Sequence, residues 1–308
     1  MDQNRRDFLK TAAVLGAAVT MIDRLGAAES AAAAAGKTEP DLVAVANGEP
    51  AALLDAALKE FGGIKTFVKP GQKVVIKPNI AWDRTPESSA NTNPQLIAAL
   101  VRRCLEAGAA KVTVFDHTCD RDWQSCYRKS GIEEAVRTAG GEIVCGNHQS
   151  DFKRTAIPRG KVMKEALVHR LVLEADVFIN VPVLKNHGGA KLTASLKNLM
   201  GIVWDRREMH QKGVQQCIAD VASIRPPDLN ILDAYRAMQT GGPQGRANSK
   251  VLMPKSLLLS RKMVPLDVAG AKMLAIDPAI ATHIAEAQAL GLGEADLTKL
   301  QIRRIKLA

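Results

Sequence analysis

The pattern of a parallel β-α-β unit begins at Lys73-Val-Val-Ile-Lys77, a short β-branched run that stops at Pro78-Asn79. Residues 94–108 follow with apolar side chains at helical spacing, opened by a proline and closed by a glycine. The next β-branched run is Lys111-Val-Thr-Val-Phe115, which ends at Asp116-His117. Apolar strands that alternate with helices of about ten to fifteen residues favour a parallel sheet covered on both faces.

The same alternation continues through the rest of the chain. We expect further helices at 53–61, 132–138, 192–200, 214–224, 268–274 and 278–290, and further strands at 142–145, 177–181, 229–232 and 302–305. Residues 147–164 are the least periodic and fit either an insertion or an edge hairpin. The sequence therefore predicts an α/β fold, a mostly parallel sheet with helices on both faces, as one domain over residues 36–308.

The N-terminal residues have the pattern of a targeting signal. Asn4-Arg5-Arg6-Asp7-Phe8-Leu9-Lys10 is followed by an apolar run to Ile22 and an Ala-rich stretch to Ala35. This pattern resembles a twin-arginine export signal, and an amphipathic helix is the alternative. The apolar run is shorter than the roughly twenty residues that span a bilayer. We expect a signal peptide over residues 1–35, cleaved between Ala27 and Ala35 unless it stays as a tether, and no transmembrane segment in the mature chain.

A leader of this kind makes the twin-arginine export machinery a partner and the periplasm, or another extracytoplasmic space, the destination. The route carries proteins that are already folded, often with a cofactor in place. A metal or redox group is therefore a candidate cofactor, although some passengers of this route carry none.

The chain carries a basic excess that belongs to its folded part. Its 308 residues include 42 Lys and Arg against 32 Asp and Glu, a formal net charge of +10. Residues 1–35 hold four of each sign, so their removal leaves the charge unchanged. This balance points to an anionic partner such as nucleic acid, a membrane surface or an acidic small molecule. Export and an aromatic fraction of only 4% argue against nucleic acid.

Five cysteines offer no cluster motif. No two of them are separated by the two residues typical of zinc and iron–sulfur loops. Cys119 and Cys126 are the closest pair, and an oxidising compartment permits a disulfide between them. Cys104 and Cys217 lie in helical patterns and are expected to be buried thiols. We expect no iron–sulfur cluster held by this chain itself.

Polar residues follow four of the predicted strands. They are Lys77 with Asn79, Asp116 with His117, Lys185 to His187, and Asp233. Ligands of open α/β sheets bind outside the carboxyl ends of the strands. Four endings that mix cations, amides and carboxylates therefore predict a binding site at one edge of the sheet.

The densest polar segment, residues 181–212, predicts an anion pocket. A helix that begins near Lys191 would present Lys197 on one face, next to Asn198. Thr193 or Ser195 near the start of this helix would cap it, or bind an anion together with its free N–H groups. A second glycine-rich loop, with Gly242 and Gly245, suits a wall of the same pocket. The alternative is a solvated basic helix after a flexible turn.

Two histidines and an aspartate are the candidates for chemistry. His187 and His210 can act as general acid and base or as metal ligands, and Asp116 can orient them or complete a metal site. His117 or Asp205 would be further ligands, but no closely spaced ligand motif is present. Dinucleotide, phosphate-loop and serine-hydrolase motifs are also missing from the sequence, which argues against those enzyme classes.

The sequence is similar to the domain-of-unknown-function 362 family from about residue 73 to residue 293. The resemblance rests on Ile76 to Asn79, Thr92-Asn93-Pro94, Asn180 to His187, Leu192-Thr193, Leu196 to Gly201, His210, Asp233, Gly241 to Gly245 and Leu290 to Gly293. The family has no assigned function. Its members are often labelled as iron–sulfur-associated, and some add a cysteine-rich ferredoxin-like segment that this sequence lacks.

Two functions are compatible with these observations, and they leave open whether the chain is an enzyme. The first is an exported protein that binds a small carboxylate or phosphate, with acid/base or metal-assisted chemistry at His187, His210 and Asp116. Its ligand-binding residues would be Lys77, Asn79, Lys185, Thr193, Lys197, Asn198, Asp233, Gly242 and Gly245. The second, favoured by export and by the resemblance, is a redox accessory protein that associates with an iron–sulfur or other metallocofactor partner protein.

Overall fold

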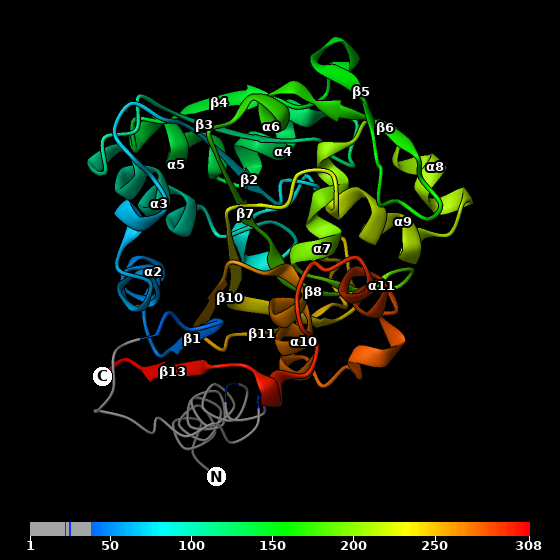
Figure 1. The fold of residues 1–308 in the computed structure, drawn as a ribbon. Helices are drawn as coiled ribbons and strands as arrows, with labels where there is room; N and C mark the ends of the chain where they lie inside the picture. The colour runs from blue at the N-terminus through cyan, green and yellow to red at the C-terminus, as the bar shows by residue number, and fades with distance from the viewer. Residues whose placement is uncertain (1–21, 23–24, 26–37) are drawn as a thin grey trace.

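An eleven-stranded sheet runs through the computed structural model, which describes Ile22, Leu25 and residues 38–308 (Figure 1). The predicted signal peptide lies, apart from those two residues, outside the described part. The sheet has the order β13-β1-β12-β10-β7-β2-β3-β4, with β8, β9 and β11 paired beside β10. The strands are β1 (Leu42–Ala46), β2 (Lys73–Pro78), β3 (Lys111–Asp116), β4 (Glu142–Cys145), β7 (Val177–Val181), β8 (Val183–His187), β9 (Lys191–Thr193), β10 (Leu229–Thr240), β11 (Lys250–Leu252), β12 (Ser256–Ser260) and β13 (Ile302–Lys306).

The sheet is mostly parallel, as predicted. From β10 through β7, β2 and β3 to β4, each strand is parallel to the next, and β8 is parallel to β10. Strand β12 is antiparallel to both β1 and β10, and β13 closes the edge parallel to β1. The first and last described strands therefore lie side by side.

Helices cover both faces of the sheet because its strands are apolar on both sides. In β2, Val75 packs into one hydrophobic core, while its neighbours Val74 and Ile76 pack into the other. The helices of one face are α2 (Pro50–Glu60), α3 (Pro94–Glu106), α4 (Trp123–Lys129) and α5 (Ile132–Thr138). The helices of the other are α6 (Arg170–Glu174), α7 (Ser195–Asn198), α8 (Arg206–Gln211), α9 (Val214–Ala222), α10 (Met263–Met273) and α11 (His283–Ala289).

Helix α3 shows how local sequence sets these boundaries. The Asn93 side chain accepts a hydrogen bond from the Gln95 N–H at 2.9 Å, and Pro94 occupies the first turn, where a missing N–H costs nothing. Gly108 follows the helix with a φ of +92°, a conformation that favours glycine. The predicted helix is therefore correct.

Four predicted elements are wrong in their extent. The helix expected over residues 268–274 begins at Met263 as α10, and the one expected over 278–290 is a 3₁₀ turn at Pro278–Ile280 followed by α11. The helix expected over residues 192–200 begins only at Ser195, because a turn at Gly188-Gly189 folds residues 191–193 back onto β8 as strand β9. The strand expected to stop before Asp233 continues as β10 to Thr240, since β12 and β11 extend its pairing. The irregular region at 147–164 contributes β5 (Phe152–Ala156), which pairs antiparallel with β6 (Glu165–His169). These two strands form a small sheet of their own, so they are not an edge hairpin of the main sheet.

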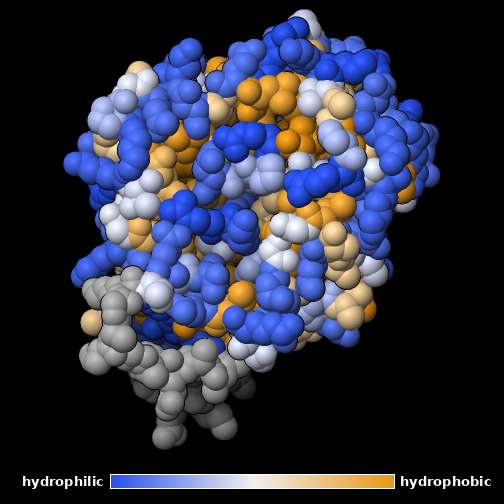
Figure 2. Space-filling view, viewed as in Figure 1, coloured by the Kyte–Doolittle hydropathy of each residue, from blue (hydrophilic) through white to orange (hydrophobic). Residues whose placement is uncertain are grey.

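The surface in the view of Figure 1 is mainly hydrophilic, with scattered apolar patches (Figure 2). Large apolar side chains exposed within the described residues are Val162, Met253 and Ile280. Over the same residues, no helix combines the length and the apolar character that crossing a membrane requires.

Candidate functional site

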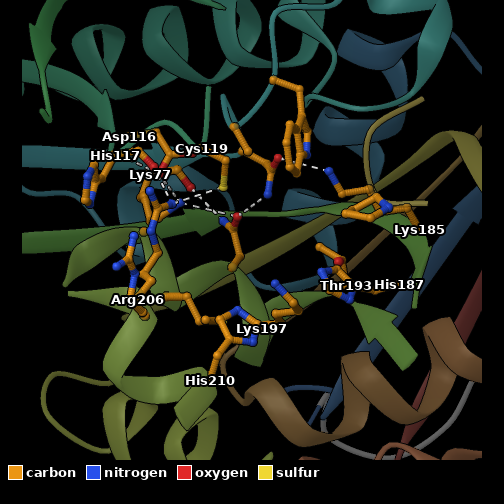
Figure 3. Close-up of a pocket in the computed structure, with 18 of the residues that line it drawn as sticks. Lys77, Asp116, His117, Cys119, Lys185, His187, Thr193, Lys197, Arg206 and His210 are labelled. Atoms are coloured by element: carbon orange, nitrogen blue, oxygen red, sulfur yellow. Dashed lines mark hydrogen bonds and ion pairs between the residues drawn. The ribbon is translucent and has the colours of Figure 1, made fainter. Parts of the chain in front are cut away.

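A cavity of about 830 Å³ opens at the carboxyl ends of β2, β3 and β8 (Figure 3). Strands β2 and β3 are parallel neighbours, which brings Lys77 and Asp116 to the same edge of the sheet. Helix α8 and the residues before it form the opposite wall. The lining residues include Lys77, Asn79, Trp82, Asp116, His117, Cys119, Lys185, His187, Thr193, Lys197, Asn198, Gly201, Trp204, Asp205, Arg206, Arg207, His210 and Pro243.

A buried ion pair forms the floor of the cavity. Lys77 Nζ lies 2.7 Å from Asp116 Oδ1, and both side chains are at most 2% exposed. Asp116 also accepts hydrogen bonds from the backbone N–H of Ile80 at 2.7 Å and of His117 at 2.9 Å. Burial lowers the pKa of Lys77, and the neighbouring carboxylate opposes that effect. Gly201 covers the pair so closely that a Cβ there would overlap Asp116 Oδ1 and lie 2.6 Å from Lys77 Cε.

An amide network joins this floor to the second lysine. Asn198 Oδ1 accepts hydrogen bonds from Asn79 Nδ2 at 2.9 Å and from Lys77 Nζ at 3.3 Å. Asn198 Nδ2 donates to Asn180 Oδ1 at 2.9 Å. Asn79 Oδ1 in turn accepts from Lys185 Nζ at 3.2 Å. Buried amides with this many partners hold one arrangement, which fixes the positions of both ammonium groups.

Lys185 and Lys197 differ from Lys77 because no carboxylate of the described residues pairs with them. Lys185 is 1% exposed, and its Nζ donates to the Ala90 carbonyl as well as to Asn79. Lys197 is half-buried and has no side-chain partner in the described part of the chain. Burial first, and then Lys197, lowers the pKa of Lys185 to about 7. Burial likewise lowers the pKa of Lys197 to about 8, helped by Arg206.

A buried hydroxyl without a hydrogen-bond partner among the described residues lines the same cavity. Thr193 is 2% exposed and lines the cavity, and its Oγ1 forms no hydrogen bond with any described residue. Buried polar atoms are rarely left unsatisfied, so such an atom calls for an explanation.

The sequence offered Thr193 or Ser195 as the cap of helix α7, but neither side chain caps it. The N-terminus of α7 is held instead by Asp267 of α10, which accepts from the Ser195 N–H at 2.7 Å and the Leu196 N–H at 3.2 Å. Burial raises the pKa of Asp267, and His283 opposes that effect. No local sequence signal links residue 267 to helix α7.

Both candidate histidines line the cavity, His187 from the end of β8 and His210 from α8. The Ala190 N–H donates to His187 Nδ1 at 3.0 Å, which leaves Nε2 as the donor of a neutral ring. Burial, Lys197 and Lys185 lower the pKa of His187 to about 2. Burial also lowers the pKa of the more exposed His210. Among the described residues, no group of three or more His, Cys, Asp and Glu side chains is arranged to hold a metal ion.

The other histidine at this edge has a packing role. His117 stacks on Trp204 with ring centroids 5.0 Å apart, and its Nδ1 lies 3.0 Å from the Val203 carbonyl. Burial lowers the pKa of His117 to about 4. The ring therefore supports the α8 wall as a neutral side chain.

Three predicted ligand residues lie outside the cavity lining. Asp233 is buried within β10, where its carboxylate accepts from the Asn93 N–H at 2.7 Å and the Tyr235 N–H at 3.0 Å, and burial raises its pKa to about 6. Gly242 donates to Asn186 Oδ1 at 3.2 Å, and a Cβ there would overlap the Asn186 carbonyl. Gly245 packs against residue 88. Of their loop, Pro243 reaches the cavity.

Arg206 and Cys119 line the cavity although the sequence did not predict either as a ligand residue. Arg206 donates from Nη1 to the His117 carbonyl at 2.8 Å and to Cys119 Sγ at 3.2 Å, and from Nη2 to the Thr118 carbonyl. Cys119 and Cys126 are both free thiols, the first exposed and the second buried, and Cys104 and Cys217 are buried as expected. The contact of Arg206 with residue 119 depends on how α8 folds over the sheet, so no local sequence pattern indicates it.

The residues of this site lie within the part of the chain that matches a known protein family. The model of a family described as domain of unknown function DUF362 matches residues 74–272, and a twin-arginine translocation signal matches residues 2–21. This signal directs export to the periplasm or extracytoplasmic space, as predicted. A thylakoid-associated protein of Synechocystis sp. is 29% identical over 252 residues, which cover 78% of this chain and 75% of that protein.

The solved structures that match this chain have low sequence identity to it. The lactate racemase apoprotein of Thermoanaerobacterium thermosaccharolyticum is 12% identical, with a TM-score of 0.44 over 69% of this chain and 54% of its own. A protein from Thermotoga maritima is 10% identical, with a TM-score of 0.44 over 79% of this chain and 60% of its own. The chain thus spans little more than half the length of these two structures.

Proposed function

The chain belongs to the DUF362 family and is exported by the twin-arginine pathway, and we propose that it binds a small carboxylate or phosphate in the cavity beside β2, β3 and β8. The observation that carries this proposal is the pair of lysines, 185 and 197, that face the cavity without a carboxylate partner in the described residues. A buried cation without a counter-ion is costly, and a bound anion would remove that cost.

The charges around the cavity support the same proposal. Five cationic side chains line it against two carboxylates: Lys77, Lys185, Lys197, Arg206 and Arg207 against Asp116 and Asp205. One carboxylate, Asp116, is already bound to Lys77. A concave site with a surplus of one sign concentrates ligands of the other. The volume of about 830 Å³ falls within the usual range for small-molecule sites.

The donors divide into a supporting set and a binding set. Lys77, Asn79 and Asn198 bond mainly to one another and to Asp116, so they fix the floor. Lys185, Lys197 and the Thr193 hydroxyl keep hydrogen-bonding capacity for an anion.

Neutral His187 and His210 are the groups placed for proton transfer to or from a bound ligand. The neutral ring of His210 at the exposed rim can accept a proton and exchange it with solvent. His187 can only donate, from Nε2, because its Nδ1 already accepts the Ala190 N–H. Asp116 supports Lys77 in this scheme and does not face the ligand as a base, because its carboxylate already has three partners.

Thermal unfolding with and without sulfate or phosphate tests the anion site. Each anion should raise the Tm of the wild-type protein, since binding to the native state stabilises it by mass action. The Lys185→Met, Lys197→Met double variant should lose that rise. A matched control, Lys59→Met with Lys153→Met, removes the same charge from exposed positions outside the lining and should retain it. An equal rise in both double variants would show that the anions bind elsewhere.

A further inference from the structure

Cys119 is the one cysteine in the lining of the cavity, and its thiol is free and exposed. It lies three residues beyond β3, in a loop held by a hydrogen bond from its own N–H to the Ala81 carbonyl at 2.8 Å. Its sulfur accepts a hydrogen bond from Arg206 Nη1 at 3.2 Å. Figure 3 shows Cys119 beside Lys77 and Asp116, on the floor side of the cavity.

The other four cysteines are placed differently. Cys104, Cys126 and Cys217 are buried, and Cys145 is partly exposed in β4 and does not line the cavity. A molecule bound in the cavity therefore meets a single thiol.

A second observation points to a ligand in the same cavity. The Thr193 hydroxyl is buried in the wall without a partner, and Lys185 and Lys197 lack counter-ions among the described residues. These three groups suit a carboxylate, which accepts several hydrogen bonds through its two oxygens. A carboxylate held there would leave the rest of its molecule inside a cavity that also exposes a sulfur nucleophile.

We propose that Cys119 is a nucleophile toward the bound anion, and that the ligand class is a small carboxylate with an aldehyde or ketone carbonyl. This inference rests on the proposed anion site. In the step, a bond forms between Cys119 Sγ and the carbonyl carbon, and the π pair of the carbonyl moves to its oxygen. That oxygen takes the proton that the thiol gives up, so the hemithioacetal forms without any oxidant, reductant or third reactant.

Alkylation by iodoacetate and by iodoacetamide tests the placement of the thiol. The two reagents are nearly the same size, and one carries the carboxylate that the cavity should bind. At Cys119 of the full exported protein, the ratio of the iodoacetate rate to the iodoacetamide rate should exceed that of a blocked cysteine amide by about 10-fold or more. The iodoacetate rate should saturate with concentration and fall when sulfate is added. Peptide mass spectrometry locates the modified residue, with Cys119→Ser as the control.

The lysine variants test whether the preference for iodoacetate comes from the positive charge of the cavity or only from the exposure of the thiol. Lys185→Met with Lys197→Met should bring the ratio down to that of the blocked amide, and Lys59→Met with Lys153→Met should keep the wild-type ratio. Both reagents react with the same thiol, so a change in its reactivity alters the two rates together and leaves their ratio unchanged. A wild-type ratio equal to that of the blocked amide would overturn the inference even if the lysine variant failed to fold. If sulfate still stabilised the wild type in that case, the anion site would stand and only the role of Cys119 would fall.

Carbon-13-labelled glyoxylate, a carboxylate with an aldehyde, tests the chemical class. The wild-type protein should give a hemithioacetal carbon signal that Cys119→Ser lacks. A preference for iodoacetate without that signal would overturn the carbonyl class.

Discussion

Asp116 Oδ1 lies 2.7 Å from Lys77 Nζ, at the meeting point of two strands whose carboxyl ends form the floor of the cavity. This pair contrasts with Lys185, whose ammonium group is equally buried but has only an amide and a carbonyl as acceptors. The two lysines therefore have different tasks. The first is a fixed structural cation, and the second keeps its charge available for a ligand.

Removing the carboxylate of this pair should destabilise the fold strongly. Asp116→Asn would leave Lys77 buried without a counter-ion, which typically costs about 3–5 kcal/mol. The free energy of unfolding from urea titration measures the loss. Adding Lys77→Met to Asp116→Asn removes the stranded charge and should restore part of the stability. A double variant as unstable as the sum of both single variants would contradict the pairing.

Asp267 should act on anion binding through helix α7. Asp267→Asn weakens the hydrogen bonds to the Ser195 and Leu196 N–H groups and should lower stability by about 1 kcal/mol, as the loss of a cap does. It should also reduce the Tm rise with sulfate, because α7 carries Lys197. Asp277→Asn is the matched control, since Asp277 caps the short helix Pro278–Ile280 and does not line the cavity. An unchanged sulfate response in the α10 variant would show that α7 needs no such support.

Sulfate affinity should fall as the pH rises from about 7 to 9. Lys185 and Lys197, with pKa values of about 7 and 8, lose their protons over this range, and sulfate keeps its charge. Each lysine that must regain a proton weakens binding by up to about tenfold per pH unit above its pKa. Isothermal titration calorimetry at several pH values measures this slope. A constant Kd from pH 7 to 9 would exclude both lysines as the binding cations.

Without an anion, the same groups should make the protein more stable as the pH rises. The unfolded chain keeps its lysine protons up to the ordinary pKa of 10.5, while the folded state releases them near 7 and 8. Between these values the unfolded state binds more protons, so the free energy of unfolding increases with pH. Urea titrations at low salt measure the slope, and the Lys185→Met, Lys197→Met variant should show a smaller one.

Chelation should not affect anion binding if lysines supply the charge. Treatment of the protein with EDTA should leave the sulfate-dependent rise in Tm unchanged. A rise that disappears with EDTA and returns with added metal would assign the anion to a metal ion, with His187 and His210 as its candidate ligands. Metal analysis of the untreated protein also tests the redox accessory function.

The regular elements could be predicted because their signals are local. The strand at 73–77, the helix after Asn93 and the strand at 111–115 each follow from a periodicity or a capping residue within the segment itself. The prediction of a helix over residues 192–200 was wrong at its start. The composition of these residues suits a helix, but the turn at 188–189 and the pairing with β8 place residues 192 and 193 in strand β9. Tertiary pairing overrides propensity in short segments of this kind.

The sequence by itself determined the export signal, the α/β class and the gathering of polar residues at one edge, because parallel strands end on the same side of a sheet. Only the tertiary structure decided which of them reach the cavity. It pairs Lys77 with a carboxylate and leaves Lys185 without one, holds Asp233 inside a long strand, and places Arg206 on the sulfur of Cys119. Periodicity records which face a residue takes within its own element. Which distant residue lies opposite depends on how the elements pack, and that packing decides where charge is left to bind an anion.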